Sequence, residues 1–506
     1  MKRNGYMLIA ALLLSAVTIL LPTSAPAAQP VGASEAAAEL AEPTEEASAR
    51  LPELYLSAQS STDSAKNYII SQLETASEEI AVYEHGYRVS VSELSDLMLE
   101  IIYERPDIFY LSREYGYSYT SDGSVYVLKP AYTHAGTALS EARTEYEQMI
   151  AKLTAMASKD WSELETALFY HDYIVSNFAY DSATLSIADA YGMLKQKSGV
   201  CQAYTLLYAD ILNRLGINNT AAVSNTMSHV WSVIEIDGAW YHADLTWDDP
   251  LVNGSDIKGR VYHNNFLCSP DAIAATGHSD WVYADRKEHS FSSKYDNAFF
   301  KELVRPTHVH STGIYYLDEA DSYIKRYDTE TNTATALFYI DSTAYVYGEN
   351  TSYTKVQSGF CGYGGKLYYS AQQKNSGCVF IYEYDIGTAK TNLLYTIECA
   401  AGSAQSVYGM YSDGETICYL FADSPNDLAS GTLYSFKVQV QTQEQSGLLM
   451  DTDGDGKITN CDLALLLRFL SGWKDTGIEL RNADINGDSS ITEADALALA
   501  RSLARA

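Results

Sequence analysis

The segment Ser198-Gly199-Val200-Cys201-Gln202-Ala203-Tyr204 decides how we interpret this 506-residue chain, because it places a thiol at the predicted start of a helix. Apolar residues recur at helical spacing up to Leu215, and Gly216 is a typical stop signal. With Ser198 as the expected N-cap, Cys201 lies in the first turn, where unpaired N–H groups and the helix dipole lower the pKa of a thiol. The same groups can stabilise an oxyanion. Taken alone, the segment also fits a small buried cysteine.

A β-hairpin is predicted downstream of this helix. The apolar runs 229–236 and 240–247 are joined by Asp237-Gly238, which is a strong two-residue turn signal. That loop length puts His229 and Asp244 diagonally across the hairpin on one face, about 7–8 Å apart at the backbone. An imidazole–carboxylate hydrogen bond can span this distance. A three-residue loop would place Asp244 on the opposite face.

A thiol, an imidazole and a carboxylate are what nucleophilic acyl transfer requires. In this interpretation Cys201 is the nucleophile, His229 the base and Asp244 the group that orients the imidazole. His242, on the Asp244 strand, is the competing base and ranks second.

These sequence segments together resemble those of the transglutaminase-like superfamily. The matching segments lie within about 165–285 and are Gly199 to Tyr204, His229-Val-Trp231, and Asp237-Gly238-x-Trp240-Tyr241-x-x-Asp244-x-Thr246-Trp247-Asp248. The segments 104–110, 262–266 and His278-Ser-Asp-Trp281 resemble flanking parts of its bacterial branch. The resemblance implies a papain-like α/β fold with the three roles given above. Tyr180 is a further candidate for lining the site.

The sequence leaves open which of two molecules accepts the acyl group. Water gives hydrolysis of a peptide or amide, which we favour, and an amine gives protein cross-linking. A binding or structural subunit with a vestigial triad is a third possibility. No pair of carboxylates could be assigned to glycoside hydrolysis.

The N-terminus reads as a secretory signal peptide. Lys2 and Arg3 precede an uncharged apolar run of 15 residues, 7–21, and an Ala25-Pro26-Ala27 cleavage site. The run is short for a membrane-spanning helix. We therefore expect a secreted mature protein without a membrane span.

The net charge and the cysteine content argue against other classes of protein. With 34 basic and 65 acidic residues the net charge is −31, which opposes binding to nucleic acids and anionic membranes. Seven cysteines are too few for a disulfide scaffold, although the four between 361 and 418 could pair locally.

Two acidic loops repeat at the C-terminus with an offset of 33 residues. Oxygen ligands at loop positions 1, 3, 5 and 12, with a backbone carbonyl at position 7, form a calcium site of EF-hand type. The predicted ligands are Asp451, Asp453, Asp455, Lys457 and Asp462 in the first loop and Asp484, Asn486, Asp488, Ser490 and Asp495 in the second.

With Asp at position 12, the repeat resembles a type I dockerin over 448–506. This implies two structural Ca²⁺ ions, a cohesin domain of a scaffoldin as partner, and a place in an extracellular cellulosome. Residues that the resemblance places against the cohesin are Asn460, Cys461, Arg468, Glu493, Ala494 and Arg501. Ser489 replaces the usual glycine of the loop, so the second site is expected to bind calcium more weakly.

We therefore expect a multidomain α+β protein with a papain- or transglutaminase-like core, an antiparallel β-repeat domain and a small all-α dockerin. Strand-like runs recur with a period of about 50 residues after residue 300. The expected parts are a signal peptide (1–27), a linker (28–50), an N-terminal α/β accessory region (51–150), the catalytic core (151–295), the β-rich repeats (300–440), a linker (441–447) and the dockerin (448–506).

Overall fold

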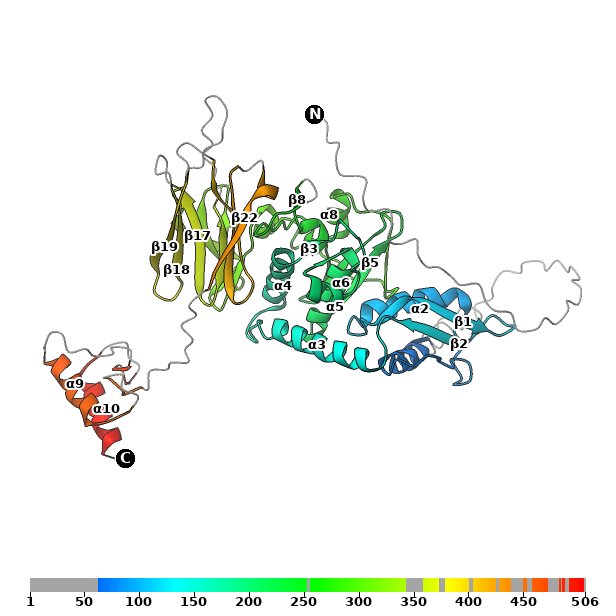
Figure 1. Ribbon diagram of the computed structural model, residues 1–506, viewed down its shortest axis with the longest axis horizontal. Helices are drawn as coiled ribbons and strands as arrows, with labels where there is room; N and C mark the ends of the chain where they lie inside the picture. The colour runs from blue at the N-terminus through cyan, green and yellow to red at the C-terminus, as the bar shows by residue number, and fades with distance from the viewer. Residues whose placement is uncertain are drawn as a thin grey trace, which may run out of the picture. The chain divides into compact units, whose positions relative to one another are not determined.

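The computed structural model describes residues 62–252, 255–342, 358–372, 378–399, 404–424, 427–437, 449–452, 457–471, 482–483, 485–486 and 491–504 (Figure 1). It divides after residue 436 into two compact units. The predicted signal peptide and both linkers lie outside the described residues. Among the described helices, none combines the length and the apolar character needed to cross a membrane.

The first unit begins with a small α/β region. A helix over 62–74 precedes α2 (Val91–Glu104), whose first turn is closed by a capping box between Ser90 and Glu93. Strands β1 (Leu111–Tyr119) and β2 (Val125–Tyr132) form an antiparallel pair, as the hairpin signal Asp122-Gly123 predicts. The apolar face of α2 is buried, so this region packs inward rather than standing alone.

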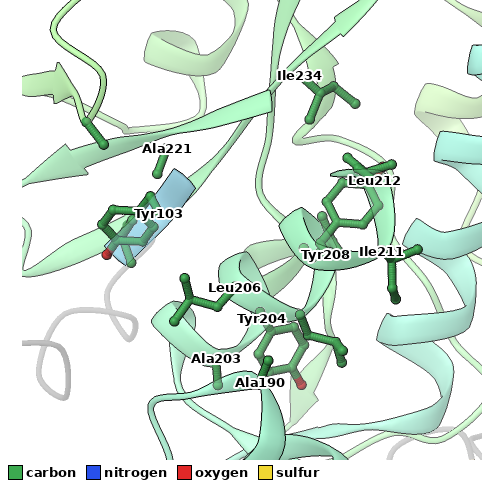
Figure 2. Packing of buried hydrophobic residues seen from close by; sticks show 14 of the residues in the cluster. Tyr103, Ala190, Ala203, Tyr204, Leu206, Tyr208, Ile211, Leu212, Ala221 and Ile234 are labelled. Atoms are coloured by element: carbon green, nitrogen blue, oxygen red, sulfur yellow. The ribbon is translucent and has the colours of Figure 1, made fainter. Parts of the chain in front are cut away.

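Helix α6 (Cys201–Arg214) lies at the centre of this unit. Its first twelve residues are all buried, including the polar Gln202, Thr205 and Asp210, so the helix is enclosed by the core on every side. Figure 2 shows Leu206 of this helix in one buried cluster with Tyr103 of α2 and Ala221. The surrounding helices are α3 (Gly136–Thr154), α4 (Glu163–Asn177) and α5 (Ala190–Gln196).

A five-stranded antiparallel sheet packs against α6. Its order is β10-β7-β6-β5-β11, formed by Phe266–Cys268, Ala239–Ala243, His229–Ile236, Asn219–Ser224 and Trp281–Tyr283. Ile236 pairs with Ala239, which confirms the two-residue loop, and Ser232 pairs with Ala243. Short elements complete the core: β3 (Ala179–Tyr180), β4 (Ser198–Gly199), α7 (Leu245–Asp248), β8 (Leu251–Val252), β9 (Ser255–Asp256) and α8 (Pro270–Ala275).

The predicted N-cap of α6 is wrong. Ser198 and Gly199 form β4, which pairs in parallel with β3, so the helix starts two residues later and Val200 is its N-cap. Because Val200 has no polar side chain, it makes no side-chain cap. Cys201 nevertheless lies in the first turn, as the first helical residue.

Three antiparallel sheets follow the 3₁₀ helix η1 (Phe299–Glu302), which confirms the predicted repeats (Figure 1). Sheet one contains β12 (His308–His310), β13 (Gly313–Asp318), β14 (Tyr323–Asp328) and β15 (Thr333–Tyr339). Sheet two contains β16 (Phe360–Tyr363), β17 (Lys366–Gln372), β18 (Cys378–Asp385) and β19 (Lys390–Glu398). Sheet three contains β20 (Ser406–Ser412), β21 (Thr416–Ala422) and β22 (Thr432–Lys437), with η2 (Leu428–Ser430) before β22.

The four cysteines between 361 and 418, which could have paired locally, do not form disulfides. All seven cysteines lie among the described residues, and none of them forms a disulfide. Cys361 and Cys418 are instead buried within the β-sheets.

The second unit contains α9 (Asn460–Leu470) and α10 (Glu493–Leu503). Each helix begins with the same capping box, between Thr459 and Asp462 and between Thr492 and Asp495. The two helices pack through a small core of Leu466, Ala483, Ala496 and Leu499.

Candidate active site

The thiol of Cys201 lies at the start of α6 and is 7% exposed. Burial acts to raise the pKa of a thiol, because it disfavours the charged form. A hydrogen bond to His229 and the charge of that imidazole outweigh burial, so the pKa of Cys201 is lowered. The structure therefore pairs a buried cysteine with a specific proton acceptor.

His229 begins β6, and Asp244 follows β7 as the N-cap of α7. His229 Nε2 lies 2.7 Å from Asp244 Oδ2, so its other nitrogen, Nδ1, is the one that faces the thiol. Burial disfavours the charged ring, but the carboxylate overcomes this effect and raises the pKa of His229 to about 10. Conversely, the imidazole holds the pKa of the buried Asp244 well below its usual range.

These shifts invert the usual order of the thiol and imidazole pKa values. Between the two pKa values the proton resides on His229, and the sulfur of Cys201 is a thiolate. Such an ion pair is the reactive form of a nucleophilic cysteine.

Two tryptophans pack against the imidazole. The ring of His229 is stacked with Trp231 and with Trp247, at centroid distances of 5.6 Å and 5.7 Å. Aromatic faces stabilise a cationic ring and restrict its rotation. Trp247 is 41% exposed and forms the solvent side of the site.

Asp244 makes more hydrogen bonds than the sequence predicted. Its Oδ1 accepts the backbone N–H groups of Thr246 and Trp247, at 3.0 Å and 3.2 Å. Its Oδ2 accepts a second imidazole, that of His278, at 2.9 Å. We missed this role for His278, although His278-Ser-Asp-Trp281 was the available signal.

The competing base, His242, does not join the site. Its Nδ1 accepts a hydrogen bond from Trp231 Nε1 at 2.9 Å, and burial lowers its pKa to about 3. The ring is therefore neutral and already engaged. By contrast, Tyr180 lies within electrostatic range of Cys201: burial raises the pKa of its phenol to about 12, and the charges of Cys201 and Asp244 add to that rise.

A second histidine–aspartate network lies deeper in the core. His171 Nδ1 lies 2.9 Å from Asp172 Oδ1, and its Nε2 lies 3.1 Å from Asp248 Oδ2. His263 Nε2 lies 2.8 Å from the same oxygen of Asp172. This group, and the group of His229, Asp244 and His278, could each hold a metal ion by the spacing of their ligand atoms. The distances within both are those of ordinary hydrogen bonds, so we describe them as hydrogen-bonded networks.

The described calcium-loop residues fit a closed loop. Asp451 and Asp462, at positions 1 and 12, are buried, and Thr452 N–H donates to Asp462 Oδ1 at 2.7 Å. In the second loop Asn486 N–H donates to Asp495 Oδ1 at 3.0 Å. The remaining described ligands, Lys457 and Asn486, have exposed side chains. Five predicted ligands lie outside the described residues, namely Asp453, Asp455, Asp484, Asp488 and Ser490.

The predicted cohesin-facing side chains are all exposed on α9 and α10. They are Asn460, Cys461, Arg468, Glu493, Ala494 and Arg501. Leu467 and Leu497 are also exposed, at 48% and 51%.

Comparison with known families agrees with this architecture. Residues 148–245, which include Cys201, His229 and Asp244, match the transglutaminase-like superfamily. Residues 449–504 match the dockerin type I domain. No curated protein shows significant similarity to this chain.

Two solved structures resemble part of the chain. One is the crystal structure of a TGase, with 12% identity and a TM-score of 0.19 over 32% of this chain and 50% of that chain. The other is a proposed cysteine protease from Cytophaga hutchinsonii, with 16% identity and a TM-score of 0.18 over 38% of this chain and 81% of that chain. The chain thus spans about half the length of the TGase.

Proposed function

We propose that this protein is a secreted cysteine acyl-transfer enzyme that hydrolyses peptide or amide bonds in protein substrates. The observation that carries the proposal is the buried Cys201–His229–Asp244 arrangement, with its thiol pKa lowered and its imidazole pKa raised. A purely structural cysteine would show the effect of burial alone.

The mechanism follows from the two nitrogens of His229. The thiolate of Cys201 attacks the carbonyl carbon, and N–H groups at the start of α6 stabilise the oxyanion. Nδ1 of His229 donates its proton to the leaving amine, and a thioester to Cys201 forms. The neutral imidazole then takes a proton from water, which attacks the thioester and releases the acid and the thiol. Asp244 keeps the ring in one orientation throughout.

The same thioester can be attacked by an amine instead of water. A protein cross-linking transglutaminase is therefore the alternative function. A third possibility is an inactive binding subunit, and an unreactive Cys201 would support it. The match to the transglutaminase-like superfamily fits both enzymatic outcomes.

The dockerin match supports structural calcium and attachment to a cohesin domain in an extracellular cellulosome. We propose two Ca²⁺ ions, one in each loop. Carboxylates and backbone carbonyls of the loops would hold them, and their chemistry there is to neutralise the clustered carboxylates and fix the loops. No role in acyl transfer is assigned to calcium.

The test is alkylation of the folded protein with iodoacetamide across pH 5–9, with the modified sites located by mass spectrometry. Exposed Cys461 is the internal control, and His229→Ala is the matched variant. We expect Cys201 to react faster than Cys461 below pH 8 despite its burial, and His229→Ala to remove the difference. Slower labelling of Cys201 than of Cys461 in the wild type would contradict the proposal.

If Cys201 is reactive, a peptide library incubated with and without a primary amine separates the two chemistries. Cleaved products in the presence of the amine indicate hydrolysis, and amine-bearing products indicate cross-linking.

A further inference from the structure

His278 occupies a position that the three-residue mechanism does not use. It lies between α8 and β11 and is 2% exposed. Its Nε2 approaches Asp244 Oδ2 at 2.9 Å, the same oxygen that receives His229 Nε2 at 2.7 Å. One carboxylate oxygen thus lies between two imidazoles.

The second nitrogen of His278 also faces an oxygen. Its Nδ1 lies 2.9 Å from Thr276 Oγ1, and that hydroxyl donates its own proton to the carbonyl of Ile273 at 2.7 Å. The hydroxyl of Thr276 thus holds the second nitrogen of His278 in place, which leaves Nε2 for the carboxylate. Because a carboxylate only accepts hydrogen bonds, His278 Nε2 is the second N–H donor to Asp244 Oδ2, beside His229 Nε2.

The ring of His278 is held in this orientation by aromatic contacts. Its centroid lies 4.2 Å from Trp247 and 4.7 Å from Trp231, the two rings that also pack against His229. Gly277, which precedes it, has φ of +114°, a conformation that residues with side chains rarely adopt. Both features fix the approach of Nε2 to the carboxylate.

A second N–H donor on Asp244 changes how strongly the carboxylate holds the proton of His229. The negative charge of Asp244 stabilises the proton on His229, and a second hydrogen bond to the same oxygen offsets part of that stabilisation. His229 must release its proton to the leaving amine, so an imidazolium held too strongly would be a poor acid. The other titratable groups that face the site are Cys201 from α6, Tyr180 from β3, Tyr103 from α2 and His242 from β7.

We propose that His278 is a positioning residue of the thiol site: as the second N–H donor to Asp244, it fixes the carboxylate and limits its hold on the proton of His229. This inference rests on the proposed function, because it concerns the same ion pair.

The experiment compares Cys201 alkylation by the anion iodoacetate in wild type, His278→Leu and His278→Gln. The His229 imidazolium attracts an anionic reagent, so the alkylation rate falls at the pH where that ring loses its proton, and this pH is the alkaline limit of the ion pair. Leucine removes the N–H donor to Asp244. Glutamine keeps an N–H donor. Brief pulses of iodoacetate limit the time that the protein spends at alkaline pH. Thermal unfolding checks that each variant is folded.

We expect the alkaline limit to move upward by about one pH unit in His278→Leu, since a hydrogen bond that offsets the charge of Asp244 has been removed. His278→Gln should shift the limit in the same direction by less, because its amide keeps an N–H donor. His289→Gln is the matched control, because this histidine packs on Trp240 away from Asp244 and should leave the limit unchanged. A folded His278→Leu with an unshifted or lowered limit would overturn the inference. Absence of a bell-shaped profile in the wild type would instead contradict the proposed function.

Discussion

His229 is restrained by three contacts. Asp244 fixes its Nε2, and its ring is stacked with Trp231 and with Trp247. Few rotamers of the imidazole satisfy all three contacts, so its Nδ1 is directed toward Cys201 before any substrate binds. Preorganisation of this kind reduces the entropy that the reaction must lose.

The pKa order of the pair predicts the pH dependence of thiol reactivity. We expect iodoacetate to label Cys201 with a bell-shaped profile. The acid limb follows the lowered pKa of the thiol, where the nucleophile forms as pH rises. The alkaline limb lies near pH 10, where His229 loses its proton. Asp244→Asn should move the alkaline limb to lower pH and reduce the labelling rate at pH 7 by about 100-fold or more. A single limb near the pKa of an ordinary thiol would exclude the ion pair.

At the scale of residues, local rules predicted part of this geometry. The Asp237-Gly238 turn determines the hairpin register, and register determines that His229 and Asp244 share a face. His278 could not be placed in this way, because it reaches Asp244 from a loop 34 residues further along the chain. No periodicity links two such segments, and only their packing in three dimensions brings them together.

At the scale of elements, α4 and α7 are joined by buried charge. His171 of α4 contacts Asp248 of α7, and Asp172 of α4 accepts Thr307 N–H and Oγ1 at 2.6 Å and 2.7 Å. The network thus links the helices beneath the catalytic hairpin to the segment that enters the β-sheets. Breaking a buried pair is costly because it leaves a charge without compensation.

We expect Asp172→Asn to lower the free energy of unfolding by about 3–5 kcal/mol. The carboxylates raise the pKa of buried His171 to about 9, although burial opposes this, and the imidazoles hold the pKa of Asp172 below its usual range. The His171 contribution is therefore complete below about pH 6.5 and is lost as pH rises through about 9. The Asp172 contribution is complete above about pH 4 and is lost as pH falls.

Urea unfolding of wild type and Asp172→Asn across this pH range measures the effect. Exposed Asp160→Asn serves as control and should change stability by less than about 0.5 kcal/mol. Equal losses in the two variants would show that the network contributes little.

Elements were predicted well where periodicity is strong. The hairpin β6–β7 and the antiparallel sheets after residue 300 lie where the patterns place them. The start of α6 was misplaced because Ser198 is a good N-cap by composition, whereas pairing of β4 with β3 takes the same residue into a strand. Tertiary pairing decided between two locally acceptable conformations.

At the scale of the whole molecule, the N-terminal region and the catalytic core share one hydrophobic core. Phe109, which precedes β1, lies between Tyr146 of α3 and Tyr191 of α5, with both centroid distances 4.7 Å. If residues 51–150 were a detachable inhibitory segment, they would have an interface of their own. Continuous packing favours an integral part of the first unit instead.

We therefore expect Phe109→Ala to destabilise the first unit by about 3–5 kcal/mol, because it leaves a cavity between these rings. Tyr119→Ala, at a position 52% exposed, should change stability by less than about 0.5 kcal/mol. Thermal or urea unfolding measures both. A chain beginning at residue 136 that remains folded and gains Cys201 reactivity would contradict this view and support an inhibitory role.

Calcium removal should affect only the second unit. Its loops supply the predicted ligands, whereas the thiol site lies in the first unit. Excess chelator should abolish helical signal from α9 and α10 and binding to a cohesin domain, and restored calcium should recover both. The rate of Cys201 alkylation should stay within about twofold, because no calcium ligand is predicted near it. A large fall in that rate would reveal a metal requirement in the first unit.

The contact between the loop after β9 and strand β20 constrains how such a protein can arise by gene rearrangement. A Cβ at Gly259 would lie 2.2 Å from Met410 N, and one at Gly409 would lie 2.0 Å from Lys258 O. The two backbones touch so closely that a side chain at either glycine would collide with the other segment. Recombination near residue 300, which would exchange the β-sheets for those of another gene, should produce misfolded hybrids. Recombination near residue 437, the boundary between the units, should preserve both parents' structures, so a docking module can be gained or lost there during evolution without altering the enzyme.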